Sequence, residues 1–420
     1  MRVLVVGGGG REHALAWSLS HCREITEVYA APGNPGIGAL ATCVPIPADA
    51  VVELAEFAES LRVDLTVVGP ELALTLGIAD EFARRQLVLF GPCRAAAELE
   101  GSKVFTKLFC QRHGIPTAAA RVVTDRDGAV AAVRELGRPI VFKADGLAAG
   151  KGVLVCQSQD EVEEAIERFF VERAFGAAGE RVLVEECLTG DEVSFMVVTD
   201  GTTILPLASA RDYKRLQDGD KGPNTGGMGA FSPSPLPQDM AGQILREIIR
   251  PAIQGLAEEG RCYRGVLYAG VMLTARGPRL LEFNCRLGDP ETQVVLPRLD
   301  GELFPLLLAA ARGELAGHRL SWRREVAVGV VLASPGYPSG AEGGLAIQGV
   351  GNALGLPGVM VFHAGTAMQD GRLVTAGGRV LTVVGRGGTV GEAAATAYGG
   401  VDRVDFPGMF YRRDIGEGLK

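Results

Sequence analysis

Two polar residues stand two positions apart within the stretch "RLLEFNCRLGDPETQ". Glu282 and Asn284 lie on a predicted strand, so their side chains share one face. Two oxygen ligands on one face suit a hard cation such as Mg²⁺. A buried carboxylate is unfavourable unless it is paired or bound to a metal, and Arg286, Asp289 and Glu291 add more polar groups than a core strand holds. We therefore interpret the pair as metal ligands, although Glu282 alone could be a solvated strand residue.

A glycine-rich loop separates two predicted strands in "KADGLAAGKGV", residues 143–153. It is not a Walker loop, because only three residues separate Gly146 from Gly150. In addition, Gly152 follows Lys151 where a Walker loop has Ser or Thr. A flexible loop of this kind can close over a polyphosphate, to which Lys143 at the strand end offers a point charge. The alternative is an ordinary β-hairpin without a ligand.

The opening "VLVVGGGGREHALAWSL" invites comparison with a dinucleotide-binding fingerprint, which needs G-x-G-x-x-G after a strand. Counted from Gly7 the third glycine is replaced by Glu12, and counted from Gly8 it is replaced by His13. The acid expected after the second strand is also missing from "VYAAPGNPG". Backbone N–H groups at a helix that begins near Arg11 still favour an anion such as a phosphate. The alternative is a tight turn that binds nothing.

Two further stretches have the composition of ligand-binding segments. In "EECLTGDEVSF", backbone near Glu186 and Leu188 could hydrogen-bond an adenine, and the carboxylate of Glu192 could accept ribose hydroxyls. The stretch "NTGGMGA", residues 224–230, exposes backbone N–H groups and is expected to face the substrates. Taken alone, the second stretch is equally consistent with a plain loop.

The composition favours small-molecule ligands over nucleic acid or a membrane. The 420 residues carry 42 Lys and Arg against 50 Asp and Glu, a net charge of −8, and no basic run interleaved with aromatics. No apolar run approaches the roughly 20 residues that span a bilayer. The eight cysteines form no CxxC pair and no zinc spacing, so they are predicted to be free thiols. We expect a cytoplasmic protein; its oligomeric state stays open, with a monomer as one option.

The predicted elements divide the chain into units. Short apolar runs at 3–6, 28–31, 65–68 and 87–90 alternate with helical segments, which predicts an open parallel sheet. A helix follows with Ser102 as its N-cap and Gly114 as its stop. Beyond it come longer strands with fewer helices, and from Val326 onward a glycine-rich tail of strands. The sequence therefore predicts a mixed α/β and α+β protein of several domains.

Seven separated motifs occur in the order of a known family. They are "GGGGREHAL", "GPE", "KADGLAAGKGV", "NTGGMGAFSP", "RLGDPETQV", "LASPGYP" and "FHAGT". Together they resemble the ATP-grasp enzymes, and within them the phosphoribosylamine–glycine ligases, also called glycinamide ribonucleotide synthetases. The resemblance covers essentially the whole chain. It implies a Rossmann-like pre-ATP-grasp domain for substrate at 1–101, an ATP-grasp core at 102–325 with a lid at about 118–190, and a small β-rich domain at 326–420.

The family resemblance implies a ligase of purine biosynthesis. ATP, glycine and 5-phosphoribosylamine would give glycinamide ribonucleotide, ADP and phosphate through glycyl phosphate, with Mg²⁺ or Mn²⁺ as the metal. That scheme suits the residues, because phosphoryl transfer needs mainly positioning and charge neutralisation. The alternatives are another ATP-grasp carboxylate–amine ligase of purine metabolism and a non-catalytic nucleotide-binding protein. An NAD(P) oxidoreductase would need the third glycine and the ribose-binding acid that this chain lacks.

The resemblance also implies a role for each matching residue. The predicted ATP contacts are Lys103, Lys143, Gly146, Gly150, Lys151, Gly152, Glu185, Glu186, Leu188 and Glu192. The predicted substrate contacts are Gly8, Gly9, Gly10, Arg11, Glu71, Asn224, Gly226, Gly227, Met228 and Gly229, with the first four on the ribose phosphate and Glu71 near the ribose hydroxyls. Arg286 would hold the transferring phosphoryl group, Asp289 would orient the amine, and Asp212 and Lys214 would bind glycine. Tyr213 departs from the histidine expected in the family at that position, so we expect it only to pack or donate one hydrogen bond.

Overall fold

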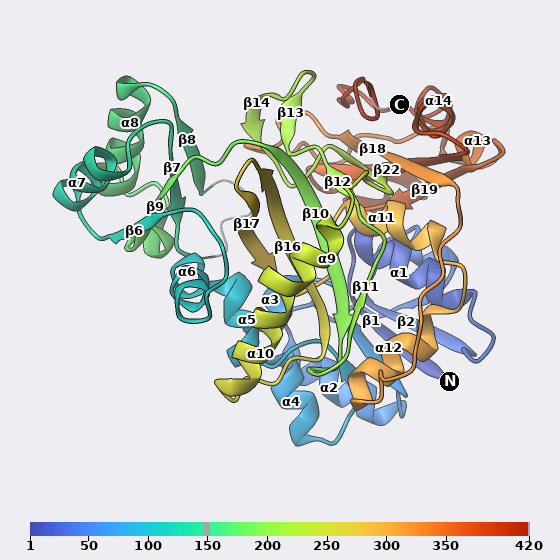
Figure 1. Ribbon diagram of the computed structural model, residues 1–420. Coiled ribbons are helices and arrows are strands. Elements are labelled where there is room, and N and C mark those ends of the chain that lie inside the picture. The colour runs from blue at the N-terminus through green and yellow to red at the C-terminus, as the bar shows by residue number, and fades with distance from the viewer. Residues whose placement is uncertain (147–151, 419–420) are drawn as a thin grey trace.

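The N-terminal unit of the computed structural model, which describes residues 1–146 and 152–418, is an open parallel sheet (Figure 1). Its strand order is β3-β2-β1-β4-β5, and every neighbouring pair is parallel. The strands are β1 (Arg2–Gly7), β2 (Glu27–Pro32), β3 (Thr42–Cys43), β4 (Leu65–Val68) and β5 (Leu89–Phe90). The connecting helices are α1 (Gly10–Ser20), η1 (Ile37–Ala39), α2 (Val51–Ser60), α3 (Glu71–Thr75) and α4 (Ile78–Arg84). The predicted parallel sheet is confirmed.

A four-stranded antiparallel sheet forms the centre of the molecule, in the order β11-β10-β16-β17. Its strands are β10 (Asp191–Thr199), β11 (Ile204–Pro206), β16 (Gly265–Thr274) and β17 (Gly277–Asn284). The surrounding helices are α5 (Arg94–Gly101), α6 (Lys103–Arg112), α9 (Met240–Ile244), η4 (Leu245–Ile249), α10 (Arg250–Glu258), α11 (Glu291–Val295), η5 (Leu296–Arg298) and α12 (Leu303–Arg312). Helix α6 starts as predicted, because Ser102 Oγ accepts the N–H of Phe105 at 3.0 Å.

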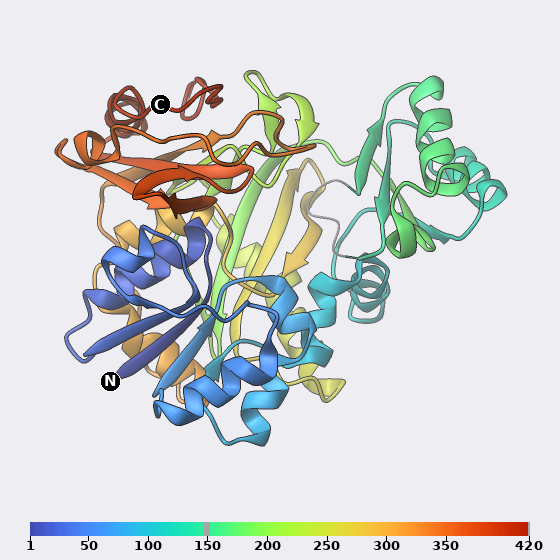
Figure 2. The same ribbon diagram turned by 180° about the vertical axis from the view of Figure 1, so that it is seen from behind.

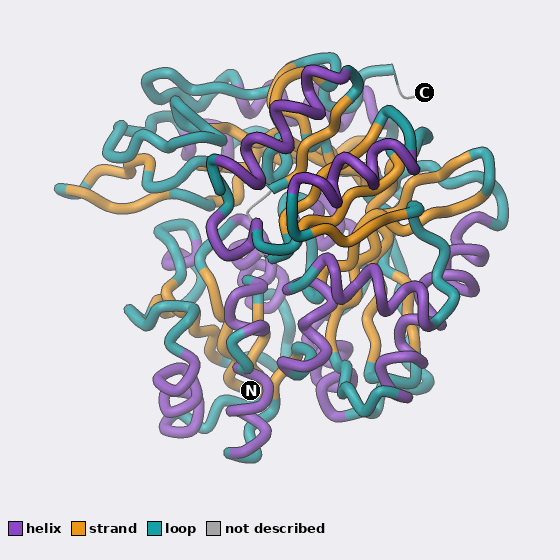
Figure 3. Tube along the Cα trace, turned by 90° about the vertical axis from the view of Figure 1, so that its left-hand side faces the viewer, coloured by secondary structure: helices purple, strands orange, loops and turns teal. Residues whose placement is uncertain are grey.

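A second four-stranded sheet projects to one side, in the order β6-β9-β7-β8 (Figures 1 and 2). Its strands are β6 (Ala120–Val123), β7 (Ile140–Ala144), β8 (Val153–Cys156) and β9 (Val182–Glu186), and its helical segments are α7 (Arg126–Leu136), α8 (Gln159–Ile166), η2 (Glu167–Val171) and η3 (Gly176–Gly179). Helices α7 and α8 face the viewer in Figure 3. Phe142, Phe169 and their neighbours form a separate hydrophobic core here, so this unit folds around its own interior.

The third large sheet joins strands from two parts of the chain, in the order β12-β15-β18-β22-β19. Its strands are β12 (Arg211–Asp212), β15 (Gly229–Ser232), β18 (Val326–Ala333), β19 (Val359–His363) and β22 (Arg379–Gly387). Nearby lie the hairpins β13 (Arg215–Gln217) with β14 (Lys221–Asn224) and β20 (Thr366–Gln369) with β21 (Arg372–Thr375), and the helices α13 (Val350–Leu354) and α14 (Val390–Val401).

No helix among the described residues is long and apolar enough to cross a membrane.

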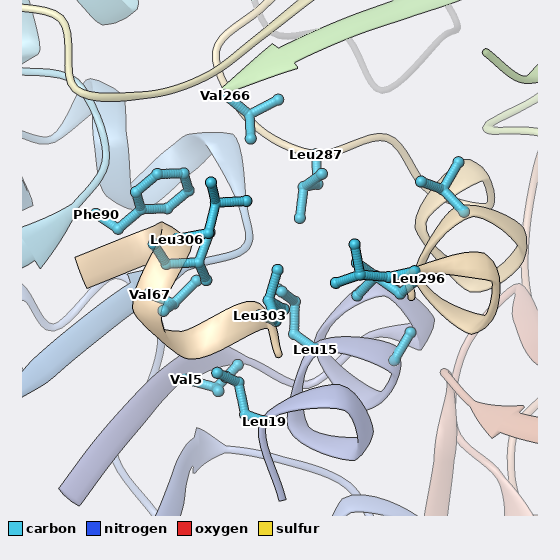
Figure 4. Packing of buried hydrophobic residues seen from close by; sticks show 14 of the residues in the cluster. Val5, Leu15, Leu19, Val67, Phe90, Val266, Leu287, Leu296, Leu303 and Leu306 are labelled. Atoms are coloured by element: carbon cyan, nitrogen blue, oxygen red, sulfur yellow. The ribbon is translucent and has the colours of Figure 1, made fainter. Parts of the chain in front are cut away.

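The N-terminal sheet is held to the rest of the molecule by a shared hydrophobic core. Leu15 and Leu19 of α1 and Val67 of β4 pack with Leu303 and Leu306 of α12 (Figure 4). All of these side chains are at most 4% exposed, and burying one leucine contributes about 1.5–3 kcal/mol. The start of α1 is therefore held beside the segment between β17 and α11, which carries Arg286 and Asp289.

Candidate active site

One cavity of about 1050 Å³ collects residues from all four units. The predicted ATP and metal residues that line it are Lys103, Lys143, Gly146, Gly152, Glu185, Glu186, Leu188, Glu192, Glu282 and Asn284. The other predicted residues that line it are Arg11, Glu71, Asp212, Lys214, Asn224, Gly226, Arg286 and Asp289. Gly150 and Lys151 lie outside the described residues. Segments far apart in the sequence thus meet around one space large enough for several ligands.

Six residues of the predicted substrate set do not line this cavity: Gly8, Gly9, Gly10, Gly227, Met228 and Gly229. Met228 is fully buried, and its N–H donates to the carbonyl of Tyr213 at 2.8 Å as the chain enters β15. A Cβ on Gly229 would come within 2.6 Å of the Gly329 carbonyl oxygen. Gly229 therefore allows close packing of two strands. The sequence pattern alone did not show which glycines of this stretch pack against a strand and which belong to a loop.

Two lysines and a buried glutamate form the end of the cavity beneath the projecting sheet. Glu185, on β9, pairs with Lys143 on β7 at 2.6 Å and with Lys107 on α6 at 2.5 Å. Burial opposes the charge of Lys143, but the attraction of Glu185 outweighs it and the pKa of Lys143 is raised. Lys103 donates to the carbonyl of Gly146 at 3.0 Å. Lys143 is thus a fixed cation at the mouth of the glycine loop.

Lys107 is a site residue that sequence reasoning missed. It lies one helical turn after Lys103 on α6, so the two ammonium groups share a helix face. Its ammonium also donates to Thr117 Oγ1 at 2.8 Å and to the carbonyl of Ala118 at 2.9 Å. The spacing of the two lysines was visible in the sequence, but nothing there showed that Glu185 would lie opposite.

The ammonium of Lys214 lies between the predicted ribose-binding and metal-binding carboxylates. It donates a short hydrogen bond to Glu192 and contacts Glu282 Oε1 at 3.3 Å. Lys214, followed by smaller contributions from other lysines, lowers the pKa of Glu282 to about 2. Asn284 Oδ1 lies on the same strand face, as predicted, and accepts from Arg286 at 3.4 Å. Glu282 thus supplies an ionised carboxylate and Asn284 a neutral amide oxygen, and both are hard donors.

A divalent cation fits this donor pair only with help from a ligand. Within residues 1–146 and 152–418, no group of three His, Cys, Asp or Glu side chains is arranged to hold a metal. Glu282 and Asn284 supply two protein oxygens, and Mg²⁺ takes its remaining ligands from water or phosphate oxygens in sites of this kind. The donor chemistry therefore suits a cation that arrives with a polyphosphate.

A second carboxylate group lies deeper, at the junction of the central and third sheets. Asp212, at the end of β12, lines the cavity, and burial followed by repulsion from Glu291 raises its pKa, with Lys214 opposing the shift. Glu291 is buried and accepts the hydroxyl of Ser194 at 3.0 Å. The elevated pKa means that Asp212 gains from a cationic partner, such as the ammonium of a small amino acid.

Arg286 is held by two carboxylates from the N-terminal half of the chain. Its Nε lies 3.0 Å from Glu71, and its Nη2 lies 2.8 Å from Glu100 at the end of α5. Burial opposes its charge, yet Glu100 and Glu71 outweigh burial and raise the pKa of Arg286. Glu100 also accepts the N–H of Cys285 at 2.7 Å. Glu100 was not predicted from the sequence, and Glu71, which was predicted near a ribose, pairs with Arg286 in this structure.

The side chain of Asp289 lies beside the N-terminus of helix α1. A Cβ built on Gly9 would be 3.5 Å from its Oδ2, and Gln293 donates to its Oδ1 at 2.7 Å. Burial opposes its charge, but Arg379 and then Arg11 outweigh burial and lower the pKa of Asp289. Arg11 is only 6% exposed and donates to Glu12 at 2.5 Å. An anion at this helix terminus would therefore share it with two carboxylates.

Comparison with known proteins identifies the family of this chain. Three family models match the chain: phosphoribosylglycinamide synthetase N domain at residues 1–100, ATP-grasp (A) domain at 101–292 and C domain at 327–418. The chain belongs to the phosphoribosylglycinamide synthetase family. The phosphoribosylamine–glycine ligase of Mesorhizobium japonicum is 52% identical over 417 residues, 99% of this chain and 98% of that protein. The expected family and its ATP-grasp fold are confirmed.

Solved structures agree with the assignment to the phosphoribosylglycinamide synthetase family. The crystal structure of the phosphoribosylamine–glycine ligase of Thermotoga maritima has a TM-score of 0.85 at 38% identity and covers 99% of this chain and 100% of that one. The N5-carboxyaminoimidazole ribonucleotide synthetase of the same organism has a TM-score of 0.66 at 18% identity, covering 96% and 99%. The second likeness concerns the fold alone.

Tyr213 stands where the resemblance leads us to expect a histidine, and its side chain contacts the C-terminal segment. It is 9% exposed, and its hydroxyl accepts the N–H of Gly416 at 3.0 Å. The guanidinium of Arg412 lies 4.8 Å from the ring centroid, a cation–π distance. Tyr213 therefore packs and makes one hydrogen bond, as the sequence predicted, although its oxygen is the acceptor.

Proposed function

We propose that this protein joins glycine to 5-phosphoribosylamine with ATP, giving glycinamide ribonucleotide, ADP and phosphate through glycyl phosphate. The observation that carries the proposal is the single cavity in which a lysine-rich end, a hard oxygen pair and Arg286 meet, in a chain of this family. An ATP-dependent ligase needs these parts within reach of one another. We place the activity in the cytoplasm, in keeping with the eight free cysteines.

For ATP, we assign the phosphates to Lys103 and Lys143 and the adenine to the backbone near Glu186 and Leu188. Glu192 would accept the ribose hydroxyls. Glu185 keeps Lys143 in place from behind, because its two oxygens are already shared by two lysines. Its part in ATP binding is therefore to position a lysine and not to contact the nucleotide directly.

For the metal, we assign Glu282 and Asn284 as the protein ligands of Mg²⁺ or Mn²⁺. The cation would supply charge neutralisation to the phosphate oxygens when it is bound. Lys214 contacts Glu282 and Glu192 together, so one ammonium is shared between two carboxylates. Ligand binding would release Glu192 to the ribose and free Lys214 to contact a carboxylate or phosphoryl oxygen.

For glycine, we assign the ammonium group to Asp212 and the carboxylate to the region of Lys214 and Arg286. A glycine oxygen would then attack the γ-phosphorus as the bond to ADP breaks, giving an acyl phosphate. Arg286 presents a planar guanidinium that suits the phosphoryl oxygens, and Glu100 and Glu71 fix its orientation. Positioned donors of this kind stabilise charge without reorganising during the reaction.

For phosphoribosylamine, we assign the space between α1, Glu71 and Asp289. Arg11 would contact the phosphate, with the α1 N-terminus favouring its negative charge, and Asp289 would accept a hydrogen bond from the amine. The amine nitrogen would attack the acyl carbon, and phosphate would leave. The lowered pKa of Asp289 keeps it ionised and ready to accept that hydrogen bond.

The proposal is tested by ADP release in a coupled assay with glycine and freshly prepared phosphoribosylamine. Omitting either substrate should reduce ADP release to background. ADP release that ignores both substrates would refute the ligase function. Release that depends on a different carboxylate or amine would assign the chain to another ATP-grasp ligase.

A further inference from the structure

Two side chains of the C-terminal part of the chain reach the cavity and clamp its central loop. Arg379, the first residue of β22, donates from Nη1 to the carbonyl of Gly226 at 2.5 Å. The hydroxyl of Tyr337 accepts the N–H of the same glycine at 2.8 Å. Both polar groups of one peptide residue are thus occupied by side chains that follow it by more than a hundred positions.

The same guanidinium also holds Asp289. Its Nη1 donates to the backbone carbonyl of Asp289 at 2.7 Å, and its Nη2 lies 3.3 Å from the carboxylate. Burial opposes the charge of Arg379, but Asp289 outweighs it and the pKa of Arg379 is raised. One planar group therefore joins two segments of the cavity wall, which a lysine cannot do because it lacks the fork.

Close packing fixes the loop between these partners. A Cβ on Gly226 would lie 3.2 Å from Arg379 Cζ and 3.3 Å from the Tyr337 hydroxyl. A Cβ on Gly227, at φ +110°, would lie 2.5 Å from Pro290 Cδ. The two glycines are needed because the loop is compressed between Arg379 on one side and the Asp289 segment on the other.

The contacts of Arg379 are confined to one end of the cavity. Asp289 adjoins the start of α1 and Gly226 is joined to it through Arg379, whereas the predicted ATP lysines stand on α6 and β7 in other units. None of the contacts described for Arg379 or Tyr337 involves a predicted ATP residue. Loss of the clamp should therefore disturb the amine substrate more than the nucleotide.

We infer that Arg379 and Tyr337 are positioning residues that set Asp289 and the Gly226 loop for the amine substrate. The inference rests on the proposed ligase function and assigns to the C-terminal domain a part in substrate selection. Arg379 acts through Asp289, and Tyr337 acts through the Gly226 peptide. Misplacing a positioning group by about 1 Å can reduce a rate about 100-fold.

The test compares Arg379→Lys and Tyr337→Phe with the full-length wild type and with Arg386→Lys as a control. Arg386 lies on the same strand, where it pairs with Glu325 on the surface. Steady-state ADP release gives kcat and KM for each substrate, and titration calorimetry gives the Kd for ATP. We expect kcat/KM for phosphoribosylamine to fall about 10- to 100-fold in Arg379→Lys and less in Tyr337→Phe, with the Kd for ATP within about twofold of wild type.

Each outcome decides the inference. Wild-type kcat/KM for phosphoribosylamine in both variants overturns it, and so does a parallel loss of ATP affinity with a lower Tm, which would indicate a merely structural role. Because Tyr337→Phe removes only one oxygen, it stays informative if Arg379→Lys folds poorly. A wild type that releases ADP without either substrate overturns the proposed function and the positioning role together, whereas an active wild type isolates the second question.

Discussion

The placement of Lys214 predicts a specific defect when its charge is removed. In the Lys214→Met variant, Glu192 and Glu282 would face each other without the cation that now joins them. The carboxylate of Glu282 would lose the main reason for its low pKa. We expect the variant to be less stable than wild type near neutral pH, because two carboxylates remain close together in a partly enclosed space.

The size of the effect follows from the pKa. Lowering the pKa of Glu282 from 4.5 to about 2 corresponds to at most about 3.5 kcal/mol at neutral pH, at about 1.4 kcal/mol per pKa unit. The side chain is 39% exposed, so solvent screening reduces that figure to about 1–2 kcal/mol. A depressed carboxylate pKa stabilises the fold above the unfolded value of 4.5, and this stabilisation is lost as pH falls from there towards 2.

The assay is urea unfolding of wild type and Lys214→Met at several pH values between 7 and about 2.5. The difference in unfolding free energy should be about 1–2 kcal/mol at pH 7 and should shrink only below about pH 4.5, where the unfolded chain takes up a proton at Glu282 that the folded wild type does not yet bind. The control is Lys221→Met, which removes an exposed lysine from β14. A destabilisation of Lys214→Met that stays constant with pH would refute the electrostatic argument.

Three other substitutions test separate parts of the cavity. Glu282→Ala should abolish ADP release by removing a metal ligand while the protein still folds, with a loss of stability no larger than that expected for Lys214→Met; near-normal turnover at millimolar Mg²⁺ would contradict the assignment. Glu100→Gln should lower kcat by up to about 100-fold because Arg286 loses one of its two anchors, and an unchanged kcat would show that Glu71 suffices. Lys107→Met should reduce stability in urea by about 3 kcal/mol, since it leaves Glu185 with a single partner, and a loss below about 1 kcal/mol would mean that Lys143 alone satisfies that carboxylate.

Local features of the site could be predicted because they depend on spacing along the chain. The period of a strand places Glu282 and Asn284 on one face, and a helix start needs a cap such as Ser102. The parallel N-terminal sheet followed from alternating strands and helices. Each of these inferences involves residues within a few positions of one another.

Pairings between residues of distant segments could not be predicted from the sequence. Glu185 lies opposite Lys107, and Glu100 lies opposite Arg286, only because sheets and helices from different units pack around the cavity. The glycines after Asn224 show the same limit, since Gly229 faces a neighbouring strand and not the ligand space. A residue type indicates what a side chain can do, whereas the partner it meets is decided by tertiary packing.

The arrangement of charges explains how an acidic protein can accept anionic substrates. The chain carries a net charge of −8, yet the cations Lys143, Lys214, Arg286 and Arg379 are gathered in one cavity. Each cation is fixed by a carboxylate from another element, which maintains its charge despite burial and limits its motion. Because fixed dipoles and charges need little reorganisation when negative charge moves from one oxygen to another, these ion pairs favour phosphoryl transfer more than loosely held lysines would.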